Sequence, residues 1–178
     1  TFAERGGFDL ILGNPPWIKM EWKEQGVLSD RQPLFAVKKY TASQTARMRD
    51  KVLKEQDIYD LYFNEYEEAS GTLNFLDAVQ NYPDLRGVQT NLYKCFLPQA
   101  WMFGAGTGVS AFLHPEGVYD DPRGGLLRRR LYHRLKKHFH FVNELKLFPE
   151  VDHHVQFSLN VYSNTVSDSF DTIANLYS

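Results

Sequence analysis

The sequence predicts an α/β fold in which an open, mainly parallel sheet is interrupted by a long helical insert. An apolar run at residues 10–12 has the length and composition of a buried strand in a parallel sheet. Residues 33–69 contain few helix breakers and place apolar residues at spacings of three and four, which predicts helices. Residues 155–163 alternate between apolar and polar side chains, as a strand does. The expected order of elements is strand, helical insert, helix, strand, helix, strand, strand.

Composition is that of an ordinary globular chain. Its 178 residues suffice for one domain with a core, and its net charge of −2 gives no overall basic signature for nucleic acid. Any DNA contact must therefore come from local patches or from other parts of the protein. The single cysteine, Cys95, excludes an internal disulfide and a cysteine-based zinc site, and is compatible with a reducing compartment. No apolar stretch reaches membrane-spanning length and no signal peptide is visible, so we expect a cytoplasmic location.

The most informative stretch is the loop that follows the first predicted strand, residues 8–13. Pro15 and Pro16 lack a backbone N–H, so the strand cannot continue past Asn14. Ligands of open α/β sheets bind at this carboxyl edge. The Asn14 side-chain oxygen, together with the carbonyl groups of Asn14 and Pro15, could accept both hydrogens of a flat exocyclic amine. Trp17 could then stack on the base that carries the amine.

These four residues, Asn14-Pro15-Pro16-Trp17, resemble motif IV of S-adenosylmethionine-dependent amino-methyltransferases, [Asn/Asp/Ser]-Pro-Pro-[Tyr/Phe/Trp]. The Asn-first form is similar to that of the gamma-class adenine-specific DNA methyltransferases of type IIG restriction-modification and phage-defence systems. The resemblance implies S-adenosyl-L-methionine as cofactor, double-stranded DNA as partner and a flipped adenine as substrate. It makes all four residues catalytic candidates, with Asn14 also touching the cofactor. The alternative is that the prolines merely end a strand and Trp17 belongs to the core.

Two later stretches extend the resemblance. Residues 90–103 predict a helix, which Pro98 should kink or break, and resemble motif V. The resemblance makes Asn91 a candidate cofactor contact, and the alternative is a plain amide at the N-terminus of a helix. The strand predicted at 109–113 ends at His114 and resembles motif VI. The family does not prescribe His114, so we assign it no role as a general base.

The glycine-rich run 104–108 looks like a loop that binds S-adenosylmethionine, but its surroundings are reversed. Such a loop needs a strand before it and a helix after it, whereas here a helix precedes and a strand follows. We therefore interpret it as a turn between helix and strand. The chain starts at Thr1 and enters a core strand almost at once. We therefore expect a fragment, the C-terminal half of a Rossmann-like class I methyltransferase sheet, whose missing N-terminal half carries the main cofactor loop.

A basic helix is predicted at residues 126–139. Leucines recur on one of its faces at spacings of four, and its charged side chains make the one conspicuous positive patch. The candidate contacts to DNA phosphates are Arg128, Arg129 and Arg130. The alternative is a solvated outer face.

Two strands predicted at 141–148 and 155–163 match the family's closing hairpin, whose last strand runs antiparallel. Motif VIII, the loop that faces the flipped base, would fall near residues 153–157. This makes His154 and Phe157 candidates for substrate binding by stacking. Metal binding is not expected, because no carboxylate or cysteine cluster was found at ligand spacing beside the six histidines.

The predicted domain organisation is a methyltransferase catalytic fragment at residues 1–163 with a helical insert at about 18–87. Within the insert, 18–32 is expected to be a loop, and the helices are expected to end before Ser70. Residues 164–178 form a further strand or lead to a target-recognition domain, and a nuclease domain could also be attached. The alternatives to DNA adenine methylation are methylation of RNA or of a protein glutamine amide, and a non-catalytic methylase-like module for DNA binding or assembly.

Overall fold

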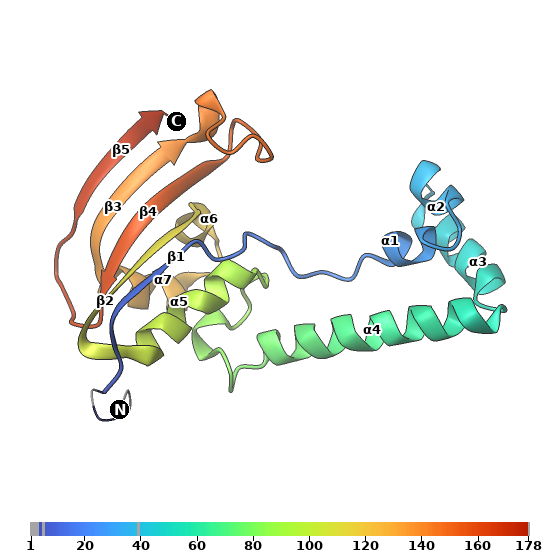
Figure 1. Cartoon of the computed structure of the whole chain (residues 1–178), viewed down its shortest axis with the longest axis horizontal. Helices are drawn as coiled ribbons and strands as arrows, with labels where there is room; N and C mark the ends of the chain where they lie inside the picture. The colour runs from blue at the N-terminus through green and yellow to red at the C-terminus, as the bar shows by residue number, and fades with distance from the viewer. Residues whose placement is uncertain (1–3, 5, 39, 178) are drawn as a thin grey trace. The chain divides into compact units, whose positions relative to one another are not determined.

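The computed structural model describes residue 4, residues 6–38 and residues 40–177. The chain divides into two compact units. The sheet unit comprises the residues up to Lys19 and those from Asp77 onward, and the helical unit comprises Met20–Leu76. The predicted α/β class with a helical insert is confirmed (Figure 1). Among the described residues, no helix combines the length and the apolar character that crossing a bilayer requires.

The sheet unit contains one five-stranded sheet with the strand order β1-β2-β4-β3-β5. β1 pairs parallel with β2, and β3 pairs parallel with β5. β4 lies between β2 and β3 and is antiparallel to both, so the expected antiparallel strand near the end of the sheet is present. The strands are β1 Phe8–Gly13, β2 Gly104–Pro115, β3 Leu135–Val142, β4 Gln156–Ser163 and β5 Asp171–Tyr177.

One face of this sheet, the covered face, packs against helices that lie on the same side of the sheet in Figure 1. Tyr93 of α5 and Tyr119 of α6 lie with their ring centroids 5.3 Å and 6.2 Å from that of His114 in β2. The helices of the sheet unit are α5 Leu92–Phe103, α6 Gly117–Asp120 and α7 Gly125–Tyr132, with short 3-10 turns η1 Pro83–Leu85 and η2 Asn143–Leu145. The buried residues of β2 and β4 on the covered face are Ser110, Phe112, His114, Ser158, Asn160 and Tyr162.

The other face, the open face, carries apolar side chains that remain largely exposed. Leu12 is 68% exposed, Leu159 40% and Ile173 52%. Strand pairing places them in one continuous surface, through Leu12 opposite Ala111 and Phe139 opposite both Leu159 and Ile173. An apolar sheet face normally packs against a further layer of structure.

The prediction that residues 10–12 form a buried strand is wrong for β1. Leu10 and Leu12 are exposed, because β1 is the edge strand of the sheet and its side chains at these positions point to the open face. The apolar run is typical of a strand covered on both faces. In the described part of the chain, Leu10 and Leu12 remain exposed, so this strand is not covered on its open face.

The interpretation of residues 104–108 as a turn is also wrong, because the glycines begin β2 itself. Gly108 passes so close to β1 that a Cβ atom would lie 2.6 Å from the Phe8 carbonyl oxygen. The pairing register of β1 and β2 shifts at this point. Gly108 therefore serves a close approach of two backbones rather than a turn.

Two boundaries in the second half of the chain differ from the predictions. The basic helix α7 ends at Tyr132, and β3 occupies 135–142, so the strand expected at 141–148 begins earlier and gives way to η2. Leucines at a spacing of four continue to Leu135, but apolar and polar side chains alternate from there on, and sheet pairing outweighs the helical pattern. The strand at 155–163 is confirmed as β4, and β5 supplies a strand within 164–178. α5 runs through Pro98 without a break.

The helical unit has a small core of its own. Leu28, Phe35, Val52 and Ile58 form its buried cluster. Contrary to prediction, residues 18–32 include a helix, and the last helix continues through Gly71. Glycine in a helix interior costs about 1 kcal/mol relative to alanine, because it loses more backbone entropy. The helices are α1 Glu24–Ser29, α2 Leu34–Val37, α3 Ala42–Val52 and α4 Gln56–Asp77.

Candidate active site

The Asn-Pro-Pro-Trp loop leaves the carboxyl end of β1, where Gly13 pairs with Phe112 of β2. Pro15 is buried and anchors the loop, whereas Asn14 is exposed. Within the described part of the chain the Asn14 side chain makes no hydrogen bond, so its amide is available to a ligand. This amide lies directly after the carboxyl end of a strand, as the sequence predicts.

The Trp17 ring is held from two directions. Its indole N–H donates to the Leu113 carbonyl oxygen of β2 at 3.3 Å. Its ring centroid lies 5.7 Å from that of Phe148 and 5.9 Å from that of Phe157. The ring is half-buried, so one part of it packs on the protein while the rest stays accessible. The structure thus brings together Trp17 and Phe157, two candidates that are far apart in the sequence.

Phe157 lies beneath this cluster and does not reach the surface. It is 2% exposed and stacks on Phe141 with a centroid distance of 5.4 Å and an interplanar angle of 10°. In this arrangement its ring supports Trp17 rather than offering a face to a base. His154, the other stacking candidate, is exposed.

Asn91 is tied to the same loop through its backbone. Lys19 and Asn91 form an isolated antiparallel bridge, and the Leu92 N–H donates to the Ile18 carbonyl oxygen at 3.0 Å. Asn91 occupies the N-cap position of α5 without a capping hydrogen bond from its side chain. Its Oδ1 atom is buried, and no described residue donates to it. The side-chain oxygen is therefore an acceptor without a donor, and its residue is bridged to Lys19, shortly after the Asn14 loop.

A polar network that sequence reasoning missed lies under the covered face. The His114 Nδ1 atom lies 2.9 Å from the Pro115 carbonyl oxygen, which can only accept, so Nδ1 carries the proton. Nε2 then accepts from the Tyr162 hydroxyl at 2.8 Å and from the Asn160 amide at 3.0 Å. Tyr119 donates to Asn160 Oδ1 at 2.7 Å. Burial lowers the pKa of His114 to about 4, so the ring is neutral and structural at neutral pH.

Glu116 and His138 form a second polar pair at the carboxyl end of β2. His138 Nε2 lies 3.2 Å from Glu116 Oε1, and both side chains are largely buried. Burial alone would raise the pKa of the Glu116 carboxyl, but hydrogen bonds from His138 and Ser158 lower it overall. The only sequence signal for the pair was that His138 falls in a segment where polar and apolar residues alternate.

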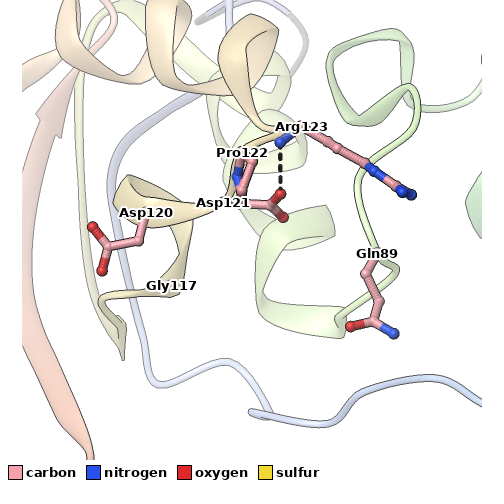
Figure 2. A pocket seen from close by; sticks show the side chains of 6 residues that line it. All are labelled: Gln89, Gly117, Asp120, Asp121, Pro122 and Arg123. Atoms are coloured by element: carbon pink, nitrogen blue, oxygen red, sulfur yellow. Dashed lines mark hydrogen bonds between the residues drawn. The ribbon is translucent and has the colours of Figure 1, made fainter.

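A polar pocket of about 540 Å³ opens beside the start of α6, directly after β2 (Figure 2). Asp121 accepts from the Arg123 backbone N–H at 2.9 Å and pairs with the Lys94 ammonium at 2.6 Å. Figure 2 shows the Asp120 carboxylate on one side of the pocket and the side chains of Gln89 and Arg123 on the other. This loop carries no motif that predicts a role from the sequence. The lining residues are Gln89, Gly117, Asp120, Asp121, Pro122 and Arg123.

Two of the three arginines proposed for phosphate contact bind oxygen atoms of the sheet unit itself. Arg130 pairs with the largely buried Asp84, and Arg128 donates to the Asp121 carbonyl oxygen. Arg129 is exposed, and its side chain makes no hydrogen bond or ion pair with any described residue. Much of the basic character of α7 is therefore compensated by neighbouring oxygens.

One possible set of metal ligands lies in the loop before β4. The ligand atoms of Asp152, His153 and His154 lie within 4.8 Å of one another, so a carboxylate does accompany this histidine pair, contrary to the sequence analysis. All three side chains are exposed. Because no buried group fixes their orientation, we assign no metal to them.

Comparisons with known proteins leave the family open. No family model matches the chain, and no curated protein matches it. Among the solved structures that match is a protein from Listeria monocytogenes that has been assigned to the class I S-adenosylmethionine-dependent methyltransferases. The two share 10% sequence identity with a TM-score of 0.38, over 62% of this chain and 32% of that one. This chain therefore spans about a third of that protein's length.

Proposed function

We propose that this chain is the C-terminal half of the catalytic domain of a DNA adenine methyltransferase. The observation that carries the proposal is the exposed Asn14 amide, which is followed by two prolines and Trp17 and lies at the carboxyl end of β1. The residue types resemble the amine-binding motif of such enzymes. Their position is the sheet edge at which α/β proteins bind ligands.

The proposed chemistry is methyl transfer to the exocyclic 6-amino group of an adenine flipped out of the duplex. The Asn14 side-chain oxygen and the Pro15 carbonyl oxygen accept the two amine hydrogens and so direct the nitrogen lone pair. Trp17 stacks on the flipped base, a contact worth roughly 1–3 kcal/mol. Proximity and orientation then supply most of the acceleration, and the amine loses its proton after the attack.

S-adenosyl-L-methionine would supply the electrophilic methyl group. The Asn14 amide and the unsatisfied Asn91 Oδ1 are acceptors suited to one edge of such a cofactor. Within the described residues, no glycine-rich loop stands between a strand and a following helix, since the glycines 104–108 begin β2. The fit of this chain to the cofactor is therefore partial, and we propose that the main binding loop belongs to a preceding half-domain.

The open face supports this division of the domain. β1 is an edge strand with exposed leucines, and Leu159 and Ile173 continue the apolar surface across the sheet. A preceding half-domain that adds a parallel strand beside β1 and helices over the open face would bury both. We expect the complete natural polypeptide that contains this chain to be the active form.

The proposal is tested by methyl transfer with the complete polypeptide. It is incubated with methyl-tritiated S-adenosylmethionine and unmethylated DNA, which is then digested to nucleosides. Label should appear in 6-methyl-2′-deoxyadenosine and fall by at least about 100-fold in Asn14→Ala, because the amine is no longer oriented. The matched control is Asn74→Ala, which removes an exposed asparagine of the helical unit and should retain full transfer.

The other outcomes identify the alternatives. Label in RNA or in a protein glutamine amide would keep the chemistry and change the substrate. Absence of transfer to any of these would contradict an enzymatic role and favour a methylase-like module for DNA binding or assembly. Equal transfer by Asn14→Ala and the parent would refute the assigned role of the loop.

A further inference from the structure

The segment that runs from η2 to the start of β4, residues 144–155 and called here the Phe148 loop, is organised by a single buried side chain. Asn143 is fully buried at its base. Its Nδ2 group donates to the carbonyl oxygens of Phe148 and Val151, each at 3.0 Å, and its Oδ1 accepts from the Phe148 N–H at 3.1 Å. The Asn143 backbone N–H also donates to the Val155 carbonyl oxygen at 3.2 Å. One residue thus closes the loop at its middle and at its end.

Closure of the Phe148 loop affects the position of Trp17. The Asn143 side chain binds both the backbone N–H and the backbone carbonyl group of Phe148. The Phe148 ring packs against Trp17 with an interplanar angle of 60°. Phe148 also meets Phe157 edge-on at 5.2 Å. The position of the Trp17 ring therefore depends on a loop whose shape depends on Asn143.

We propose that Asn143 is a positioning residue of the active site, which acts by holding Phe148 against Trp17 so that the Trp17 ring is oriented for the substrate base. This inference rests on the proposed function. It adds a residue for which the sequence motifs gave no signal and which does not touch the substrate itself. Asn143 fixes the Phe148 loop, the loop positions Trp17, and Trp17 stacks on the base.

The chain supplies a matched control in Asn164. Its Nδ2 group also binds backbone carbonyl oxygens, those of Trp101, Gly104 and Ala105, at 2.9–3.1 Å. It performs the same kind of backbone clamping beside the start of β2, at the end of the sheet away from the Asn14 loop. Asn143→Ala and Asn164→Ala thus both remove an amide that donates to backbone carbonyl oxygens, and only Asn143 binds a residue that packs on Trp17.

The first measurement reports the loop itself and requires no transfer activity. Lys146 is the one lysine or arginine between residues 144 and 155, and it is exposed. Limited trypsin digestion of the complete polypeptide, followed by mass spectrometry, measures the rate at which the fragment beginning at Leu147 is released. Asn143→Ala should accelerate this cleavage by about tenfold, whereas Asn164→Ala should leave it unchanged. Equal rates in the parent and Asn143→Ala would overturn the assignment of Asn143 as the loop's clamp.

The second measurement separates positioning from general stability. In Asn143→Ala the KM for DNA should rise by about tenfold while the KM for S-adenosylmethionine stays within about twofold of the parent's. Phe148→Ala should raise the KM for DNA similarly, and the double variant should add nothing further, because the two changes break one pathway. If both asparagine variants reduce transfer alike with unchanged KM values, Asn143 is structural only and the proposal is overturned.

Failure of the proposed function gives a different pattern. If the parent polypeptide transfers no methyl group, the role of Asn143 in placing a substrate base falls together with that function. Trypsin digestion still decides in that case whether Asn143 fixes the loop. A fast cleavage in Asn143→Ala combined with normal KM values in an active enzyme would instead overturn the positioning role alone.

Discussion

The two faces of the sheet have the reverse of the usual distribution of polarity. The covered face buries His114, Ser158 and Asn160 completely, whereas the open face leaves Leu12 and Leu159 substantially exposed. A sheet with one solvated face normally places its apolar side chains inward and its polar ones outward. The buried polar groups are tolerated because their hydrogen bonds are satisfied by one another.

This difference is the one that the proposed division of the domain predicts. The covered face is packed against helices, and its buried polar residues His114, Ser158 and Asn160 have hydrogen-bond partners. Apart from Phe157, which Trp17 and Phe148 cover, the open face has apolar side chains but, among the described residues, no layer above them, as expected if another segment completes the domain. The predictions that follow test this comparison, and they are ordered from the largest expected effect to the smallest.

The largest effect is expected from His114→Ala on the covered face. The change removes the acceptor of the Tyr162 hydroxyl and one partner of Asn160, and it leaves a cavity beneath Tyr93. We expect a loss of about 4 kcal/mol in the free energy of unfolding, measured with urea. Leu159→Ala on the open face is the control and should cost less than about 1 kcal/mol in the same chain. Similar losses for the two variants would contradict the comparison.

The second effect is a pH dependence of stability that originates at His114. Its pKa is about 4 in the folded chain and 6.5 when unperturbed, so between these values the unfolded chain binds a proton that the folded chain does not. Stability is therefore fully present above pH 6.5 and falls by roughly 3 kcal/mol as the pH drops to 4. The lowered pKa of Glu116 adds a further loss at still lower pH.

Urea unfolding at a series of pH values measures this dependence. The His114→Phe variant should lose most of the slope between pH 6.5 and 4, although its stability is lower throughout. A slope of the same size in that variant would assign the dependence to other groups.

Features that are set by neighbouring residues could be predicted from the sequence, whereas features that depend on distant packing partners could not. Pro15 and Pro16 fix their loop locally, because a residue without an N–H ends a strand in any context. The exposure of Leu10 and Leu12 could not be foreseen, because it depends on which elements pack on β1 rather than on the run itself. Leu135 lies where a helical spacing and an alternating pattern overlap. It forms a strand because it pairs with β4, which the local sequence does not show. Asn143 carries no local signal, since its partners Phe148 and Val151 bind it only once the loop has closed.

A smaller effect is expected from Tyr162→Phe. The variant keeps the ring under Trp101 and removes only the hydroxyl that donates to His114 Nε2. Asn160 still donates to that nitrogen, so no acceptor is left without a partner. We expect a loss of about 1 kcal/mol in urea unfolding, with the pKa of His114 remaining low because the ring stays buried. A loss as large as that of His114→Ala would mean that the His114 ring depends on the Tyr162 hydroxyl and that the hydrogen bond from Asn160 does not replace it.

The smallest effect is expected from Leu159→Gln in the chain Thr1–Ser178. Leu159 is 40% exposed at the centre of the open face, so exchanging it for a polar side chain should change the free energy of unfolding by no more than about 0.5 kcal/mol. In the complete polypeptide the same change should cost about 2 kcal/mol or more, because the amide would be buried without a partner under the added layer. The difference between the two measurements therefore reports whether the open face is covered. Equally small effects in both would show that the face stays exposed in the complete protein and that its apolar character has another cause.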